Sequence, residues 1–285
     1  MTDRVLERQR QILQDIACTA AGYTDLWRRI TREWRDSITG CHTWLTYAAN
    51  YLFSFDGFKW ALDPFAMSSR VANISAPDYR ADLALLSLIV LTHEHNDHLD
   101  MALVRALADL DIRWIIPHFL LEKIRRVVNL PMDKVIIPVP GEMIDVGLLQ
   151  LVPFESLHMR GGRGVPETGY LVRFAGRRWL FPGDIRNYDF KALPSFGRLD
   201  GVFAHLWLGK AQALADKPPL LEDFCAFFTS FKTERLIIGH MNEFGRDEND
   251  LWRESHYEVV REAIAHRRPG LRVEKALMGD RIDMN

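Results

Sequence analysis

Three histidines and an aspartate lie within six residues, at His93, His95, Asp97 and His98. They follow directly after an apolar run at residues 83–91, which is typical of a buried strand. In an extended chain His93 and His95 point to the same side, so they can bind one metal ion together. Asp97 and His98 follow where the chain turns toward a helix, and they can face a second ion. Imidazole and carboxylate are ligands for zinc, iron and manganese, so the stretch indicates a metal site.

An alternative is a polar helix cap that happens to be rich in histidine. A structural zinc site is disfavoured, because such sites usually use pairs of cysteines. The chain has only Cys18, Cys41 and Cys225, and no Cys-x-x-Cys pair. The odd number and wide spacing of these residues also argue against a disulfide framework.

The pattern His-x-His-x-Asp-His after a hydrophobic strand resembles the signature of the metallo-β-lactamase superfamily. That family has an αββα sandwich with one or two metal ions at one edge. It places three further ligands at later strand ends: a histidine, an aspartate in a Gly-Asp pair, and a second histidine. The matching positions are His158, Asp184 after Gly183, and His240. The resemblance covers residues 43–285 and is more specific than a match to one motif.

The resemblance also implies a role for each of these side chains. The implied ligand sets are His93, His95 and His158 for one ion, Asp97, His98 and His240 for the other, and Asp184 as the bridge between them. Asp63, in the segment 59–64, would not bind metal but would orient a ligand histidine through a hydrogen bond. The alternative for Asp63 is a turn residue before Pro64.

Local sequence texture narrows the resemblance further. The stretch His98-Leu99-Asp100 and the segment 167–170 are similar to the branch that contains ascorbate-6-phosphate lactonase and the phospholipase that cleaves N-acylphosphatidylethanolamine. Members of this branch act on several different bonds.

Two divalent ions bound in this way would yield a bridging hydroxide that attacks carbon or phosphorus. The carboxylates with expected catalytic roles are Asp97 and Asp184, and Asp97 could also orient the water or accept its proton. Zinc is the expected metal; manganese or iron would tolerate the same ligands.

Two loops carry candidate substrate contacts. Arg160 and Arg163 lie in a glycine-rich stretch after His158, and guanidinium groups bind phosphate or carboxylate in a bidentate manner. Lys210 lies in a loop that borders the site in relatives. The alternative for the two arginines is a solvent-exposed basic loop. The remaining histidines, which are His42, His118, His205, His256 and His266, are expected to be surface or hydrogen-bonded residues rather than ligands.

The predicted function is hydrolysis of a small anionic substrate, either a lactone or a phosphodiester. One alternative is a nuclease that processes tRNA or DNA. The formal net charge of −2 and the short interval between Asp184 and His240 disfavour it, so nucleic acid is not an expected partner. A second alternative is an iron-dependent oxidoreductase of the sulfur dioxygenase type.

The first residues are charged and lack the apolar core of a secretion signal. No apolar run approaches the ~20 residues that span a bilayer. These features, together with the expected reduced thiols, predict a cytoplasmic protein. A homo-oligomer is left open.

The elements that position these residues fall into two predicted regions. Residues 1–40 read as a helical extension of two helices with a break at Gly22 and Tyr23. Residues 41–285 read as the catalytic domain, with Asp56-Gly57 as a hairpin turn and a last strand within residues 272–282. The predicted fold class is α/β, a four-layer αββα sandwich with an N-terminal helical extension.

Overall fold

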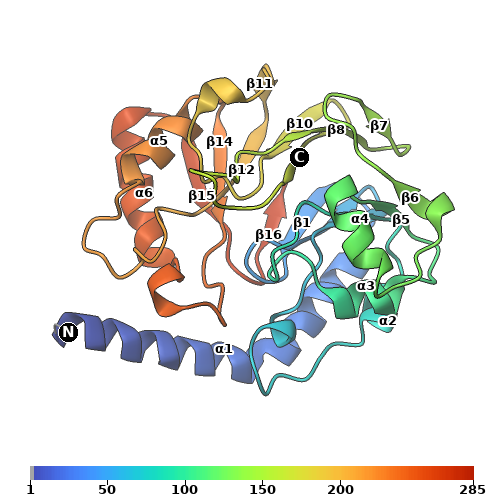
Figure 1. The fold of residues 1–285 in the computed structure, drawn as a ribbon, viewed down its shortest axis with the longest axis horizontal. Helices are drawn as coiled ribbons and strands as arrows, with labels where there is room; N and C mark the ends of the chain where they lie inside the picture. The colour runs from blue at the N-terminus through green and yellow to red at the C-terminus, as the bar shows by residue number, and fades with distance from the viewer. Residues whose placement is uncertain (1–2) are drawn as a thin grey trace.

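The computed structural model describes residues 3–285, so residues 1–2 of the predicted extension lie outside the described residues. Two seven-stranded sheets pack face to face, and helices cover their outer faces (Figure 1). The first sheet has the order β16 (Arg281–Asp283), β1 (Cys41–Leu45), β2 (Tyr51–Phe55), β3 (Phe58–Leu62), β4 (Leu88–Val90), β5 (Arg113–Ile115) and β6 (Val135–Ile136). The second has the order β15 (Arg272–Lys275), β14 (Arg235–Gly239), β12 (Gly201–His205), β10 (Arg177–Phe181), β9 (Thr168–Phe174), β8 (Gln150–Glu155) and β7 (Ile144–Asp145).

Helices form the two outer layers. The first sheet is covered by α1 (Asp3–Asp36), α2 (Tyr79–Asp82), α3 (Met101–Leu107) and α4 (His118–Arg125), and the second by α5 (Leu221–Thr229) and α6 (Glu254–Arg267). Short elements complete the described chain, namely β11 (Arg198–Leu199), β13 (Lys232–Thr233), η1 (Met67–Ser69), η2 (Met132–Lys134), η3 (Phe190–Ala192) and η4 (Glu248–Asp250). The arrangement confirms the predicted four-layer αββα sandwich.

Aromatic side chains fill the space between the two sheets. The rings of Phe53 and Trp60 stack with centroids 3.7 Å apart, and those of Phe181 and Phe203 stack at 4.4 Å. All four side chains are buried. Such pairs stabilise a fold by roughly 0.5–1.5 kcal/mol beyond the burial of their surface. The centre of the sandwich is therefore a rigid base for the loops at its edge.

The hairpin between β2 and β3 forms as predicted. Asp56 and Gly57 both have positive φ, at 47° and 85°. This is the backbone of a type I′ turn, whose twist matches that of the flanking strands.

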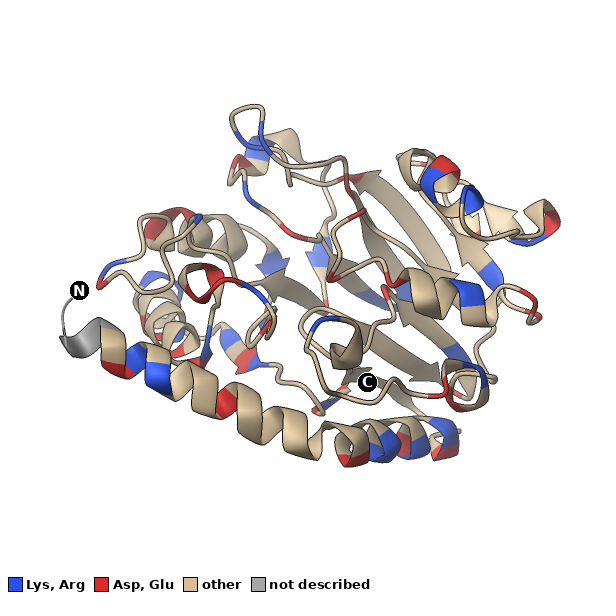
Figure 2. Ribbon diagram, turned by 60° about the horizontal axis from the view of Figure 1, so that its bottom comes forward, with Lys and Arg blue, Asp and Glu red and all other residues tan. Residues whose placement is uncertain are grey.

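The prediction of two N-terminal helices is wrong, because α1 continues without a break through Gly22. A glycine inside a helix costs only about 1 kcal/mol relative to alanine. Packing on both sides of it outweighs this cost, since Ile12, Tyr23, Trp27 and Trp34 are all buried. Figure 2 shows charged residues of both signs toward the two ends of α1.

The two parts of α1 contact different halves of the molecule. Near its end, Trp34 Nε1 donates a hydrogen bond to Phe53 O of the first sheet (2.8 Å). Near its start, Arg8 donates to Leu214 O (2.8 Å), and Asp15 pairs with Arg253. The helix therefore connects the first sheet to the loops of the second half.

The prediction of a single last strand within residues 272–282 is also wrong. Residues 272–282 contribute to two strands in different sheets, since β15 pairs with β14 while β16 pairs with β1. The apolar pattern alone does not show that the chain crosses between the sheets at residues 276–280.

Both sheets contain a parallel set of strands, β3 to β6 in the first and β10, β12, β14 and β15 in the second. Ligand-binding loops follow the carboxyl ends of such strands. The loops after β4, β10, β12 and β14 meet at one edge of the sandwich, together with the loop after the antiparallel strand β8. In the described part of the chain, no helix combines the length and the apolar character needed to cross a membrane.

Candidate metal centre

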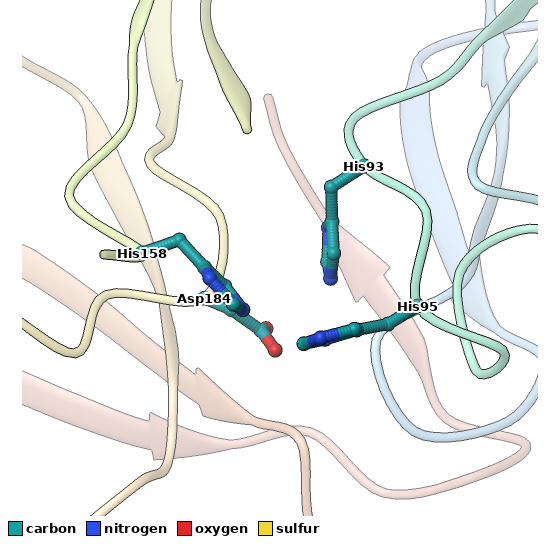
Figure 3. A group of neighbouring side chains, drawn as sticks. All are labelled: His93, His95, His158 and Asp184. Atoms are coloured by element: carbon teal, nitrogen blue, oxygen red, sulfur yellow. The ribbon is translucent and has the colours of Figure 1, made fainter. Parts of the chain in front are cut away.

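Seven side chains from four loops meet at this edge. The ligand atoms of His93, His95, His158 and Asp184 all lie within 4.8 Å of one another. Figure 3 shows these four side chains pointing toward a common centre. The ligand atoms of Asp97, His98, Asp184 and His240 form a second such group. Asp184 belongs to both groups, so its carboxylate lies where it could bridge two ions. We call the seven side chains the ligand cluster.

The ligand cluster contains ring nitrogens that a cation would satisfy. The Nε2 atoms of His93, His98 and His158 are buried and have no hydrogen-bond partner among the described residues. A buried polar atom without a partner costs free energy, and such atoms are rare in folded proteins. Neutral imidazole nitrogen together with carboxylate oxygen is a donor set that suits zinc, manganese and iron. The residues present therefore fit a pair of divalent cations.

Asp63 orients the ring of His98 through a hydrogen bond to Nδ1. Its Oδ2 lies 2.7 Å from His98 Nδ1, and its Oδ1 accepts a hydrogen bond from Thr92 N (2.8 Å). Asp63 has a φ of 44°, a strained value for this residue type, directly after β3. Asn50 holds this region as well, because its side-chain amide donates to Asp63 O and Asp97 O, both at 2.8 Å. A hydrogen bond at Nδ1 leaves Nε2 of His98 directed to the cluster.

Glu167 supports two cluster residues, and the sequence analysis assigned it no role. Its Oε1 lies 2.9 Å from His93 Nδ1, and its carboxylate accepts the backbone N–H of Asp184 at 3.0 Å. Burial, and then the nearby Asp184, raise the pKa of Glu167. Gly183 permits this contact, since a Cβ at that position would lie 2.4 Å from Glu167 Cδ. The Gly183-Asp184 pair thus reflects a close approach of Glu167 as well as a φ of 83°.

His205 is a hydrogen-bonded residue, as expected, but the sequence did not identify Asp184 as its partner. His205 ends β12, is buried, and its Nδ1 lies 2.8 Å from Asp184 Oδ1. Its ring stacks with that of His240 at a centroid distance of 5.3 Å. Its position at the end of a buried strand was the available signal. His205 thus orients the shared carboxylate of Asp184 from the second sheet.

The glycine-rich loop after β8 fixes His158. The backbone N–H of Val165 donates to His158 Nδ1 (3.1 Å), so Nε2 faces the ligand cluster. A Cβ on Gly164 would lie 2.7 Å from His158 O and 2.8 Å from its Nδ1. The loop therefore needs glycine where it folds back over the histidine.

Burial sets the protonation of one half of the cluster. It lowers the pKa of His93 to about 3 and that of His95 and His158 to about 4. These three rings are neutral near pH 7, as metal binding requires.

Ion pairs set the protonation of the other half. Although burial opposes the shift, Asp184 and Asp97 raise the pKa of His98 and His240. Although burial opposes it again, the same two histidines hold the pKa of Asp97 and Asp184 well below the usual range. Both carboxylates are therefore ionised near pH 7.

A cavity of about 540 Å³ opens beside the ligand cluster, with His95 and Asp97 in its lining. Its cationic lining residues are Arg70, Arg160, Arg163, Arg186, Lys210 and Arg246. Arg160, Arg163 and Lys210 were proposed from the sequence as substrate contacts. The structure places all three in the cavity lining.

The cationic side chains of the cavity form two groups. Arg70 and Arg246 both pair with the buried Glu243, so this one carboxylate partly compensates their two charges. The second group has weaker pairing: Arg160 lies 4.0 Å from Asp223, and Arg186 lies 3.9 Å from Asp184. Arg163 and Lys210 have no carboxylate within ion-pair distance in the described part of the chain. We call Arg160, Arg163, Arg186 and Lys210 the cationic wall.

Comparisons with known proteins agree with this architecture. The model of the Beta-lactamase superfamily domain matches residues 62–241. No curated protein matches the chain. Among solved structures, a metallo hydrolase from Ignicoccus hospitalis superposes with a TM-score of 0.64 at 15% identity, over 87% of this chain and 99% of that chain. Isothiocyanate hydrolase from Delia radicum gut bacteria has a TM-score of 0.58 at 15% identity, over 86% and 99%.

A third similar structure is CmlA, a diiron β-hydroxylase from Streptomyces venezuelae. Its TM-score is 0.58 at 16% identity, over 87% of this chain and 55% of that chain. At these identities the likeness concerns the fold. It shows that one sandwich is shared by proteins with different activities.

Proposed function

Because the chain belongs to the β-lactamase superfamily, whose domain spans residues 62–241, we propose that it is a metal-dependent hydrolase of a small anionic substrate. The observation that carries this proposal is the ligand cluster. In it, four separate loops bring seven side chains together, and the carboxylate of one of them, Asp184, belongs to both ligand groups. The buried, unpartnered ring nitrogens support binding of two cations rather than a purely structural role.

When bound, two cations would lower the pKa of a water molecule and offset the negative charge that develops on the substrate. The residues of the chain have distinct tasks around them. Asp184 is held in place by His205 and by the contact of its N–H with Glu167. Asp97, ionised beside His240 (3.2 Å), is positioned to orient the attacking water or accept its proton. Hydrolysis then forms a bond from the water oxygen to carbon or phosphorus and breaks the bond from that atom to the leaving oxygen, which takes up the proton that the water released.

The cavity supports an anionic substrate. Its cationic wall faces the ligand cluster, and guanidinium groups bind carboxylate or phosphate through paired N–H donors. Lactones and phosphodiesters are the proposed substrate classes, in keeping with the resemblance to the lactonase and phospholipase branch. Zinc is the proposed metal, with manganese or iron as alternatives, since the ligands are imidazole and carboxylate.

The test begins with elemental analysis of the purified protein. Chelated protein, reloaded with zinc, manganese or iron in turn, is then screened against lactones and phosphodiesters. We expect about two ions per chain, and turnover that is lost with chelation and restored by reloading. Hydrolysis that persists in metal-free protein would contradict the proposal, as would a metal-loaded protein that cleaves neither class.

A further inference from the structure

Arg186 occupies a position between the ligand cluster and the cavity. It follows Asp184 by two residues, and its backbone N–H donates to Leu157 O (3.0 Å). Its own carbonyl accepts a hydrogen bond from Arg160 (3.3 Å). The backbone of Arg186 is thereby tied both to the segment that carries His158 and to the cationic wall.

The guanidinium of Arg186 is incompletely satisfied. Its side chain is 18% exposed, far less than that of Arg160 at 45%. Its Nη2 lies 3.9 Å from Asp184 Oδ2, too far for a hydrogen bond. Its Nε is buried and has no hydrogen-bond partner among the described residues. A charged donor in this state needs a partner that the chain itself does not provide.

Trp207 fixes the guanidinium without using its donors. The Cζ atom of Arg186 lies 5.6 Å from the centroid of the Trp207 ring, within the range of a cation–π contact. Tyr188 holds Trp207 in turn through a hydrogen bond from its hydroxyl to Trp207 O. This contact restrains the guanidinium and leaves its N–H atoms free. Arg70 and Arg246 differ in this respect, because Glu243 occupies their donors.

We propose that Arg186 is a catalytic residue that binds the substrate oxygen on which negative charge develops as water attacks. This inference rests on the proposed hydrolase function. The oxygen is non-bridging, belonging to a phosphoryl or carbonyl group, and Arg186 neither gives nor takes a proton. The other three residues of the cationic wall bind the remote anionic part of the substrate.

The test compares Arg186→Ala with Arg163→Gln, a matched loss of one guanidinium from the same wall. Turnover of bis-p-nitrophenyl phosphate and metal content are measured for each. We expect Arg186→Ala to keep its metal and to lose ~10²-fold or more in kcat, as when an oxyanion donor is removed. Added guanidinium ion restores part of this kcat. Arg163→Gln raises KM instead, and guanidinium does not restore it.

Sulfate supplies a readout that needs no turnover. It is a tetrahedral oxyanion, and its affinity for the metal-loaded protein is measured by calorimetry. Arg186→Ala weakens sulfate binding by about tenfold or more, the value of one charge-assisted hydrogen bond. If wild-type protein binds sulfate but cleaves no ester, the proposed function and the catalytic role of Arg186 both fail, and this affinity still decides whether Arg186 binds an oxyanion.

Three results would overturn the role of Arg186. The first is an unchanged kcat in Arg186→Ala. The second is unchanged sulfate affinity in that variant. The third is loss of metal in proportion to activity, which would make Arg186 a support for Asp184 alone.

Discussion

The ligand cluster and the cationic wall lie side by side but are built differently. Cluster residues such as His93 and Asp184 are almost fully buried and lie in loops just after strands of the sandwich. Contacts with Glu167 and His205 hold them in place. The wall residues Arg160, Arg163 and Lys210 are exposed and lie on loops. Under the proposed function, the rigid cluster would set the chemistry, whereas these three exposed residues can vary and would select the anion.

The largest effect should come from removing a ligand. Asp184 belongs to both ligand groups, so Asp184→Ala should lose both cations and abolish hydrolysis; His95→Ala should abolish hydrolysis through the loss of one. Circular dichroism should remain that of the folded protein. Turnover of bis-p-nitrophenyl phosphate and elemental analysis provide the measurements, and undiminished turnover in either variant would refute the ligand assignment.

A smaller loss is expected when the support of the cluster is weakened. Glu167→Gln keeps the size of the side chain but removes the charge beside His93 Nδ1 (2.9 Å). Such outer partners typically contribute ~10–100-fold in metal affinity or activity. Competition with a chelator measures the affinity. Glu155→Gln, an exposed position at the end of β8, serves as the control and should bind metal as the wild type does.

Loss of a wall residue should affect substrate binding and spare the metal. Lys210→Met removes one charge-assisted contact, so we expect KM to rise by about tenfold while kcat and metal content stay near wild type. Steady-state kinetics on the best substrate from the screen separate the two constants. A fall in metal content would mean that the wall and the cluster are one unit.

The smallest expected effect is the change with pH in the contribution of the cationic wall to KM, in contrast to the pH dependence of metal binding. His98 and His240 have raised pKa values, so each must release a proton before it binds a cation. Occupancy of that subsite should therefore rise as the pH increases above the usual histidine value of about 6.5. Guanidinium groups stay charged over the same increase, so the contribution of Arg163 to KM should change less than about twofold. Metal titrations at a series of increasing pH values, with KM of wild type and Arg163→Gln, test the contrast.

The sequence was informative about features that a single short segment or local motif determines. The spacing of His93, His95, Asp97 and His98 predicts ligands on one loop, and the structure brings that loop to His158 and His240. The hairpin at Asp56-Gly57 and the layered fold were also predictable, since both depend on local backbone preference and on apolar periodicity.

Residues whose roles arise only from tertiary contacts could not be predicted. Glu167 and His205 act on Asp184 across the second sheet, and Asn50 reaches Asp97 from the first. Trp207 becomes relevant only because Arg186 makes a cation–π contact with its ring. The continuous α1 likewise depends on partners on both sides of Gly22, which a helix pattern does not reveal.

The course of α1 also bears on how the chain folds. In the first half of α1, Arg8 contacts Leu214, 206 positions later, and Asp15 contacts Arg253, 238 positions later. Contacts of such long range must await synthesis of these partners. On the ribosome the first half of α1 would therefore dock only after residue 253 has been made. Until then, the face around Ile12 would stay uncovered and open to a chaperone.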